Sequence, residues 1–388
     1  MATTWIKRGT LGLVGACMAV GSAQAGGFTR GDADTEILYE DGTVAARGGV
    51  IYVIPKRSFE TISGANATDD DYSKNYAIPS FSAKARISQN LSCAFTYTQP
   101  FGAKSEYGAQ AQAADRAADV AAGAPFGNAV INSKFSTNEY GGTCAVNFDV
   151  GPGQLYFLGG GFVESFDYRE TKTLGTLHLE DSSAGGYRIG TAYEIKEYAL
   201  RAELMYRSQV DHDASGNFTP SAFGAGVVGP ATRSAIGTGS LPQSVELNLQ
   251  SGIAPDWLAF GSVKWTDWSV LQTLNYTITG LGNQQKNFFW KDGWTITGGI
   301  GHSFNENVSG AVTLTWDKGV GTGADIMTDV WTLGAGAQIK SGPGVLRVGA
   351  GVSYLTSGSQ STAQRADFNA TAGGDWAYAV STSYKIAF

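Results

Sequence analysis

The stretch AYAVSTSYKIAF, residues 377–388, alternates residue by residue between two kinds of side chain. One parity is apolar or carries a methyl group, and the other parity is small or polar. The first set is Tyr378, Val380, Thr382, Tyr384, Ile386 and Phe388. Period-two alternation predicts a β-strand with one apolar face and one polar face. The apolar face of such a strand must meet either a protein core or lipid.

The composition favours a folded all-β chain over a disordered one. The 388 residues include 53 glycines, and aromatic residues make up 12% of the chain and charged residues 16%. A disordered chain would carry more charge and fewer aromatic residues. The formal net charge of −7, without a basic cluster, argues against nucleic acid as a partner.

Residues 1–25 have the pattern of a secretory signal peptide. Lys7 and Arg8 precede an apolar run over residues 11–20, and Ala23-Gln24-Ala25 forms an A-x-A cleavage site. The apolar run is too short to cross a bilayer as a helix. A lipoprotein signal ending before Cys17 is the alternative reading. Both readings predict an exported protein.

The same alternation returns along the chain and predicts fourteen strands, each of about ten residues or more, which is long enough to cross a bilayer at a tilt. Tight turns such as 305–306 alternate with long connections at 102–133, 212–241, 271–290 and 357–374. Short turns on one side, long loops on the other and an even strand count are typical of an outer-membrane β-barrel. The predicted spans are 44–58, 77–88, 91–101, 134–150, 153–168, 183–195, 197–211, 242–254, 256–270, 291–303, 307–317, 326–340, 344–356 and 375–388.

A soluble β-sandwich also alternates, but aromatic residues near the strand ends favour a barrel with interfacial girdles. These residues are Tyr97, Trp257, Trp265, Trp294, Trp316, Trp331, Tyr354 and Phe388. We therefore expect an all-β transmembrane antiparallel barrel over residues 44–388, in the outer membrane of a Gram-negative cell and with lipid around it. Its last strand must pair with its first, because a free edge in hydrocarbon leaves backbone groups unpaired at several kcal/mol each.

Two cysteines, Cys93 and Cys144, lie on neighbouring predicted strands with side chains on the same face. An oxidising compartment favours a cross-strand disulfide between them. Two unpaired thiols remain the alternative, because sequence does not give the register.

Motifs for chemistry are weak. Gly224–Gly229 matches G-x-G-x-x-G but lies in a predicted loop before Pro230, without the strand and helix that a dinucleotide site requires. His178, His212 and His302 form no metal-ligand spacing. His302 and Ser303 are adjacent on a strand, so they point to opposite faces and cannot form a nucleophile–base pair. We predict no catalytic site, metal or cofactor.

The fifth predicted strand contains QLYFLGGGFVESFDY, residues 154–168, and its lumen-facing parity is unusually apolar. Gln154 and Glu164 fix that parity, and the inward apolar residues are then Tyr156, Leu158, Phe162 and Phe166. The next two strands offer charged side chains to the lumen, namely Arg188, Glu194, Arg201, Glu203 and Arg207. The apolar wall either packs against an inward loop or the N-terminal segment, or it binds an amphipathic ligand with an anionic head, and both can hold.

Residues 241–271, LPQSVELNLQSGIAPDWLAFGSVKWTDWSVL, and 290–307, WKDGWTITGGIGHSFNEN, resemble the FadL/TodX outer-membrane transporters of long-chain fatty acids and aromatic hydrocarbons. The L-P-x-S-V strand opening, the W-x-x-W-S strand end and the W-K-D-x-W strand start carry the resemblance. It implies a fourteen-stranded barrel with an N-terminal plug. The plug, residues 26–43, would be short and lacks the family's Asn-Pro-Ala.

The resemblance further implies passive uptake of a hydrophobic small molecule, captured between the outer loops and released laterally near the third strand. In those loops the predicted binding residues are Leu174, Leu177, Phe218 and Phe223. The inward residues of the fifth strand and the cations Arg201 and Arg207 complete the predicted binding site. The last strand resembles the signal read by the barrel-insertion machinery, which is therefore an expected partner. A water-filled porin for small polar solutes is the alternative function.

Overall fold

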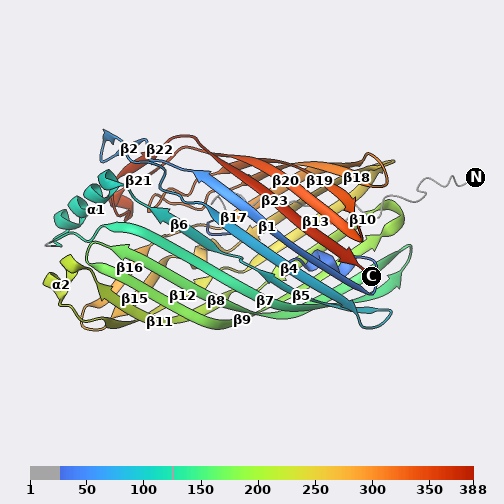
Figure 1. Cartoon of the computed structure of the whole chain (residues 1–388), viewed down its shortest axis with the longest axis horizontal. Coiled ribbons are helices and arrows are strands. Elements are labelled where there is room, and N and C mark those ends of the chain that lie inside the picture. Colours follow the sequence, from blue (N-terminus) through green and yellow to red (C-terminus); the bar gives the residue numbers. More distant parts are fainter. Residues whose placement is uncertain (1–26, 125) are drawn as a thin grey trace, which may run out of the picture.

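The computed structural model describes residues 27–124 and 126–388, so the predicted signal peptide lies outside the described residues. Nineteen strand segments form a single antiparallel sheet. The sheet closes because β1 (Val44–Lys56) pairs with both β4 (Tyr76–Arg86) and β23 (Asp375–Ala387). Figure 1 shows the result as a cylinder of tilted strands. The C-terminal strand, β23, is thus paired along its length with β1 and β20, as a barrel requires.

Fourteen strands form the wall of the barrel, which confirms the predicted fold class. The short turns between them agree with the predicted ones to within a few residues. The crossing strands besides β1, β4 and β23 are β5 (Leu91–Thr98), β7 (Val130–Val150), β8 (Gly153–Lys172), β9 (Gly175–Ile195), β10 (Leu200–Arg207), β13 (Ser244–Ala254), β14 (Trp257–Thr266), β17 (Gly293–Ser303), β18 (Val308–Asp317), β19 (Val330–Ser341) and β20 (Gly344–Leu355).

The two faces of the wall differ as the alternation predicts. On β18, Val312 and Leu314 point outward and are 47% and 50% exposed, whereas Thr313 between them is buried. An apolar outer band with a polar interior is what lipid and lumen require. Aromatic residues meet across neighbouring strands near the long-loop end, at Trp265–Trp294, Trp316–Trp331 and Tyr354–Trp376.

The long connections contain more regular structure than the sequence predicts. In the 212–241 connection, for example, β11 (Val210–Pro220) buries His212 and Phe218 but exposes Asp211 and Asp213. Beyond the bilayer both faces of a strand can be polar, so the apolar alternation that marks the wall disappears. The additional strands are β6 (Gly102–Glu106), β12 (Arg233–Leu241), β15 (Thr273–Ile278) and β16 (Gly282–Asn287), with a small sheet of β2 (Thr61–Ile62), β3 (Ala65–Asn66), β21 (Gly358–Gln360) and β22 (Ala370–Ala372).

Two helices lie at the long-loop end in Figure 1. They are α1 (Ala109–Ala121), in the Ala-rich part of the 102–133 connection, and α2 (Ala222–Val228), which holds most of the G-x-G-x-x-G match. Single 3-10 turns complete the described chain: η2 (Thr35–Tyr39), η3 (Lys196–Tyr198), η4 (Trp268–Val270) and η5 (Thr362–Gln364). Within residues 27–124 and 126–388, no helix is long and apolar enough to span a membrane.

Cys93 on β5 and Cys144 on β7 are direct cross-strand partners, and their sulfur atoms are 2.08 Å apart, as in a disulfide. The bond closes a loop of the chain that includes β6 and α1.

Candidate functional site

The N-terminal segment, residues 27–43, lies against the inward faces of the strands and divides the lumen. It fills an interruption in the third crossing strand, between β5 and β6. The N–H groups of Arg30 and Gly31 donate to the carbonyls of Pro100 (2.8 Å) and Gln99 (3.1 Å), and the Gly102 N–H donates to Phe28 O (2.9 Å). Pro100 has no N–H to continue a ladder, so the wall strand turns to pair with the segment.

Each acidic side chain between residues 32 and 40 of this segment meets a cation or a hydroxyl of the barrel. Asp34 accepts from Arg47 (2.7 Å), and Glu40 accepts from Arg47 and Lys385, both at 2.6 Å. The other contacts are Asp32–Lys264, Glu36–Arg201 and the Tyr39 hydroxyl donating to Glu203, besides Ser82 Oγ donating to Asp34. Charged contacts therefore hold the segment together with the apolar packing of Ile37 and Leu38, which are buried against the barrel.

An aromatic cavity of about 150 Å³ opens on the long-loop side of the segment. Phe28 forms its floor, with edge-on ring contacts to Phe135 (5.2 Å), Phe288 (5.7 Å) and Trp290 (4.6 Å). Trp290 lies behind this lining, whose apolar members besides Phe28, Phe135 and Phe288 are Phe59, Ala103, Phe166, Leu241, Leu271, Leu274, Ala324, Ile326 and Met327. We call this space the upper cavity.

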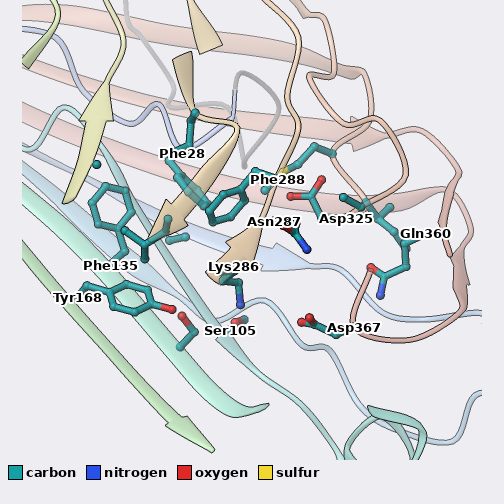
Figure 2. A pocket seen from close by; sticks show the side chains of 18 of the residues that line it. Phe28, Ser105, Phe135, Tyr168, Lys286, Asn287, Phe288, Asp325, Gln360 and Asp367 are labelled. Carbon is teal, nitrogen blue, oxygen red and sulfur yellow. The ribbon is translucent and has the colours of Figure 1, made fainter. Parts of the chain in front are cut away.

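The charged and amide groups of the upper cavity gather at one end, although Ser105 and the Tyr168 hydroxyl lie at the other. Figure 2 shows Phe28, Phe135 and Tyr168 on one side, and Lys286, Asn287, Asp325, Gln360 and Asp367 toward the other. The Asp325 carboxylate accepts from the Trp290 indole N–H through both oxygens, at 3.0 and 2.8 Å. Burial raises the pKa of Asp325 to about 7. The cavity thus has an apolar floor and a polar mouth.

A second cavity of about 330 Å³, the lower cavity, lies on the other side of the segment. Arg30 and the residues up to Glu36 form its roof. Its walls are crowded with charged side chains: Arg47, Glu139, Arg188, Arg201, Glu203, Arg207, Glu246, Lys264 and Arg347. The two cavities share no lining residue, and Phe28 belongs to the upper one alone.

A buried charge network joins β7 to β11 beside the lower cavity. Glu139 contacts Arg188 and Arg207, and Arg207 also contacts Glu164 at 2.6 Å. His212 lies between Glu164 (3.2 Å) and Asp181 (2.9 Å). Ionisable groups at membrane depth are costly and survive only when paired in the protein interior, which is the arrangement here.

The structure divides the residues of the predicted binding wall on β8 among three environments. All four side chains point inward and are buried, as the parity predicts. Tyr156 and Leu158 pack against η2 of the N-terminal segment. Phe162 lies between the guanidinium groups of Arg188 (4.8 Å) and Arg207 (4.6 Å) and lines neither cavity. Phe166 alone of the four lines the upper cavity.

The predicted loop and charged residues are also dispersed. Leu177 and Phe218 are buried in the cluster that surrounds the upper cavity, and Leu174 packs on its edge. Phe223 is 51% exposed on α2, away from the cavity lining. Arg201 and Arg207 line the lower cavity, where they are already paired with carboxylates.

Apart from Phe166, the residues that form the upper cavity were not predicted as binding residues. Phe28 lies in the predicted plug, and Lys286, Phe288 and Asp325 lie in predicted loops. A signal for them exists in KNFFW, residues 286–290, because three consecutive aromatic residues are unusual in an exposed loop.

Among the described residues, one group has the composition of a metal site. Ligand atoms of Asp167, His178 and Glu180 lie within 4.8 Å of one another, on β8 and β9. None of the three lines either cavity, so this group takes no part in the site above.

Comparison with curated proteins finds the long-chain fatty acid transport proteins of Escherichia coli (strain K12) and Salmonella typhi. Each is 30% identical over 141 residues, which is 34% of this chain. The aligned region spans about a third of those relatives, 31% and 32% of their lengths.

Solved structures share the fold at low identity. A Pseudomonas aeruginosa FadL homologue covers 95% of this chain and 94% of its own, with a TM-score of 0.70 and 13% identity. The toluene transporter TbuX of Ralstonia pickettii covers 96% and 99%, with a TM-score of 0.62 and 14% identity. Residues 34–309 match the family described as outer membrane protein transport protein (OMPP1/FadL/TodX), and the chain belongs to this family of the outer membrane.

Proposed function

We propose that the protein is a passive outer-membrane transporter for hydrophobic or amphipathic molecules, such as long-chain fatty acids or aromatic hydrocarbons. The observation that carries the proposal is the upper cavity, which has aromatic walls and the Phe28 ring as its floor. Each methylene group that leaves water for such a site contributes about 0.8 kcal/mol. A porin for polar solutes would lack this apolar step in its path.

The path beyond the cavity follows from the charge distribution. The lower cavity carries many charged side chains beside apolar ones such as Ile51 and Phe260, so an apolar ligand gains less there than in the upper cavity. The interruption between β5 and β6 lies directly beside Phe28, because Gly102 donates to the Phe28 carbonyl. We place lateral release at this interruption. Rearrangement of residues 28–31 would open it without disturbing the charged contacts of residues 32–40.

Uptake into lipid vesicles tests the proposal. Protein reconstituted in liposomes should accelerate entry of a radiolabelled long-chain fatty acid or of toluene over protein-free liposomes. Phe288→Ser should remove most of the acceleration, because Phe288 lines the cavity and is buried. Phe304→Ser, in an exposed short turn, should not change it. If Phe288→Ser folds and both probes enter at the wild-type rate, the upper cavity is not the route.

A further inference from the structure

The side chains at the mouth of the upper cavity carry a net negative charge. The lining contains one cation, Lys286, and two carboxylates, Asp325 and Asp367. Lys286 is already engaged, because its ammonium donates to Glu170 at 3.0 Å, and Glu170 is shared with Lys172 at 3.5 Å. With Lys172 and Glu170 included, the mouth holds two ammonium groups against three carboxylates, so a carboxylate ligand would meet a net negative charge.

Asp325 is the cavity residue best placed to accept a hydrogen bond from a ligand. Its hydrogen-bond donor is the Trp290 indole, and within the described chain it makes no ion pair. A carboxylate offers about four acceptor positions, so the single indole N–H leaves capacity for a second donor. The charged or titratable groups that face it are Lys286, Asp367 and Tyr72. Burial and Asp367 both raise its pKa.

The size of the upper cavity limits the apolar part of the ligand. Its volume is about 150 Å³, and an apolar cavity of roughly that volume holds one benzene molecule. The floor and walls are rings that favour edge-on or offset contacts with another ring. One aromatic ring fits between Phe28 and the polar mouth.

We propose that the upper cavity selects single-ring aromatic compounds with an uncharged hydrogen-bond donor, the phenols, over aromatic carboxylates. The phenol ring occupies the apolar end, and its hydroxyl donates to Asp325. A carboxylate on the same ring loses its hydration and meets the net negative charge of the mouth. This selectivity rests on the proposed function, since it describes the ligand of the same cavity.

Binding of three matched ligands to the purified barrel tests the selectivity. Ethylbenzene, 4-ethylphenol and 4-ethylbenzoate share the ring and side chain and differ only in the polar group. At pH 8 we expect 4-ethylphenol to bind about tenfold more tightly than ethylbenzene, as a hydrogen bond to a charged group allows. We expect 4-ethylbenzoate to bind more weakly than both, measured by calorimetry or by quenching of tryptophan fluorescence.

Asp325→Asn removes the charge and keeps the shape. It should strengthen 4-ethylbenzoate binding about tenfold, weaken 4-ethylphenol severalfold and leave ethylbenzene unchanged. Asp292→Asn is the matched control, because Asp292 also accepts from an indole, Trp265 at 3.0 Å, but lines neither cavity. In the wild type, 4-ethylbenzoate should bind more tightly at pH 6 than at pH 8, and Asp325→Asn should lose this dependence.

The outcomes separate the two proposals. If ethylbenzene binds and 4-ethylbenzoate binds as tightly as 4-ethylphenol in the wild type and in Asp325→Asn, the selectivity is overturned and the proposed function stands. If a folded barrel binds none of the three but still accelerates entry of a long-chain fatty acid, the selectivity alone is overturned. If it binds none of the three and accelerates no fatty acid entry, the proposed function fails and the selectivity fails with it.

Discussion

The upper and lower cavities lie on opposite sides of one short segment and are built from opposite kinds of contact. Rings surround the upper cavity, where Phe28 meets Phe135, Phe288 and Trp290 edge-on. Ion pairs surround the lower cavity, where Glu36 contacts Arg201 and Asp32 contacts Lys264. Apolar contacts are non-directional and tolerate an exchange of partner, whereas buried charges require particular partners. The upper side is therefore suited to ligands and the lower side to anchoring.

The largest effect is expected from breaking the anchoring side. Glu139 is 1% exposed and contacts both Arg188 and Arg207. Glu139→Ala leaves both guanidinium groups without that partner, and removing one member of a buried pair costs about 3–5 kcal/mol. Urea unfolding of the barrel in bilayers, followed by tryptophan fluorescence, measures the loss. Glu306→Ala in an exposed turn is the control, and equal losses in both variants would contradict the role given to the network.

The next effect concerns the boundary between the two cavities. Phe28→Ala removes the ring that contacts Trp290 at 4.6 Å. Loss of a buried phenylalanine costs about 3–5 kcal/mol, and partial exposure of Phe28 puts the expected value at the lower end. With the floor removed, the cavities should connect, so leakage of a small sugar from liposomes should rise. Phe304→Ala, which removes a ring from a short turn, should leave leakage at the wild-type rate.

The contrast between the two sides also explains what the sequence could predict. The wall was predictable, because lipid on one face and lumen on the other impose the same alternation on every strand. The alternation also predicted correctly that Phe162 and Leu158 on β8 point inward. The register of Cys93 with Cys144 needed the structure, since a slip by one residue reverses every side chain.

The binding site was less predictable for a physical reason. A cavity is formed by residues far apart in sequence, and the upper cavity joins Phe28 to Phe288 and Asp325 from three separate segments. Parity shows that Phe162 points inward but not that two arginines enclose it. Likewise, charge patterns show that Arg201 faces the lumen, but its partner Glu36 comes from the N-terminal segment, whose path no periodicity marks.

A smaller effect is expected from weakening the anchor of the N-terminal segment. Asp34 accepts from Arg47 at 2.7 and 2.9 Å and from Ser82. Asp34→Asn removes the charge, and hydrogen bonds to charged groups contribute about 1.5–3 kcal/mol, less where water screens them. We expect faster leakage of a small sugar, increasing further in high salt.

Asp41→Asn provides the matched control for Asp34→Asn. Asp41 also pairs with the barrel, through Lys196 at 3.0 Å, but both side chains are exposed, at 59% and 47%. Exposed pairs contribute about 0–1 kcal/mol, so leakage should match the wild type. If Asp41→Asn leaks as much as Asp34→Asn, burial is not what makes the anchor effective.

The most local effect, confined to α1, separates a carboxylate without a cation partner from the paired ones of the lower cavity. Asp115 on α1 is 5% exposed and accepts the Val130 N–H at 2.8 Å. Burial, and then Asp367, raise the pKa of Asp115 to about 7, against about 3.9 in an unfolded chain. Between these values the folded state binds more protons than the unfolded state, so the contribution of Asp115 to stability is present at low pH. It is lost as pH rises from about 4 to about 7.

Hydrogen exchange of the α1 amides reads out this loss locally. After correction for the intrinsic dependence of exchange on pH, α1 should be better protected at pH 5 than at pH 8. Asp115→Asn should remove the difference, because the amide oxygen still accepts from Val130 but does not titrate. Asp70→Asn, at an exposed position near the same helix, should retain it. A difference that persists in Asp115→Asn would assign the pH dependence of α1 to another group, because burial of this carboxylate would then not control the helix.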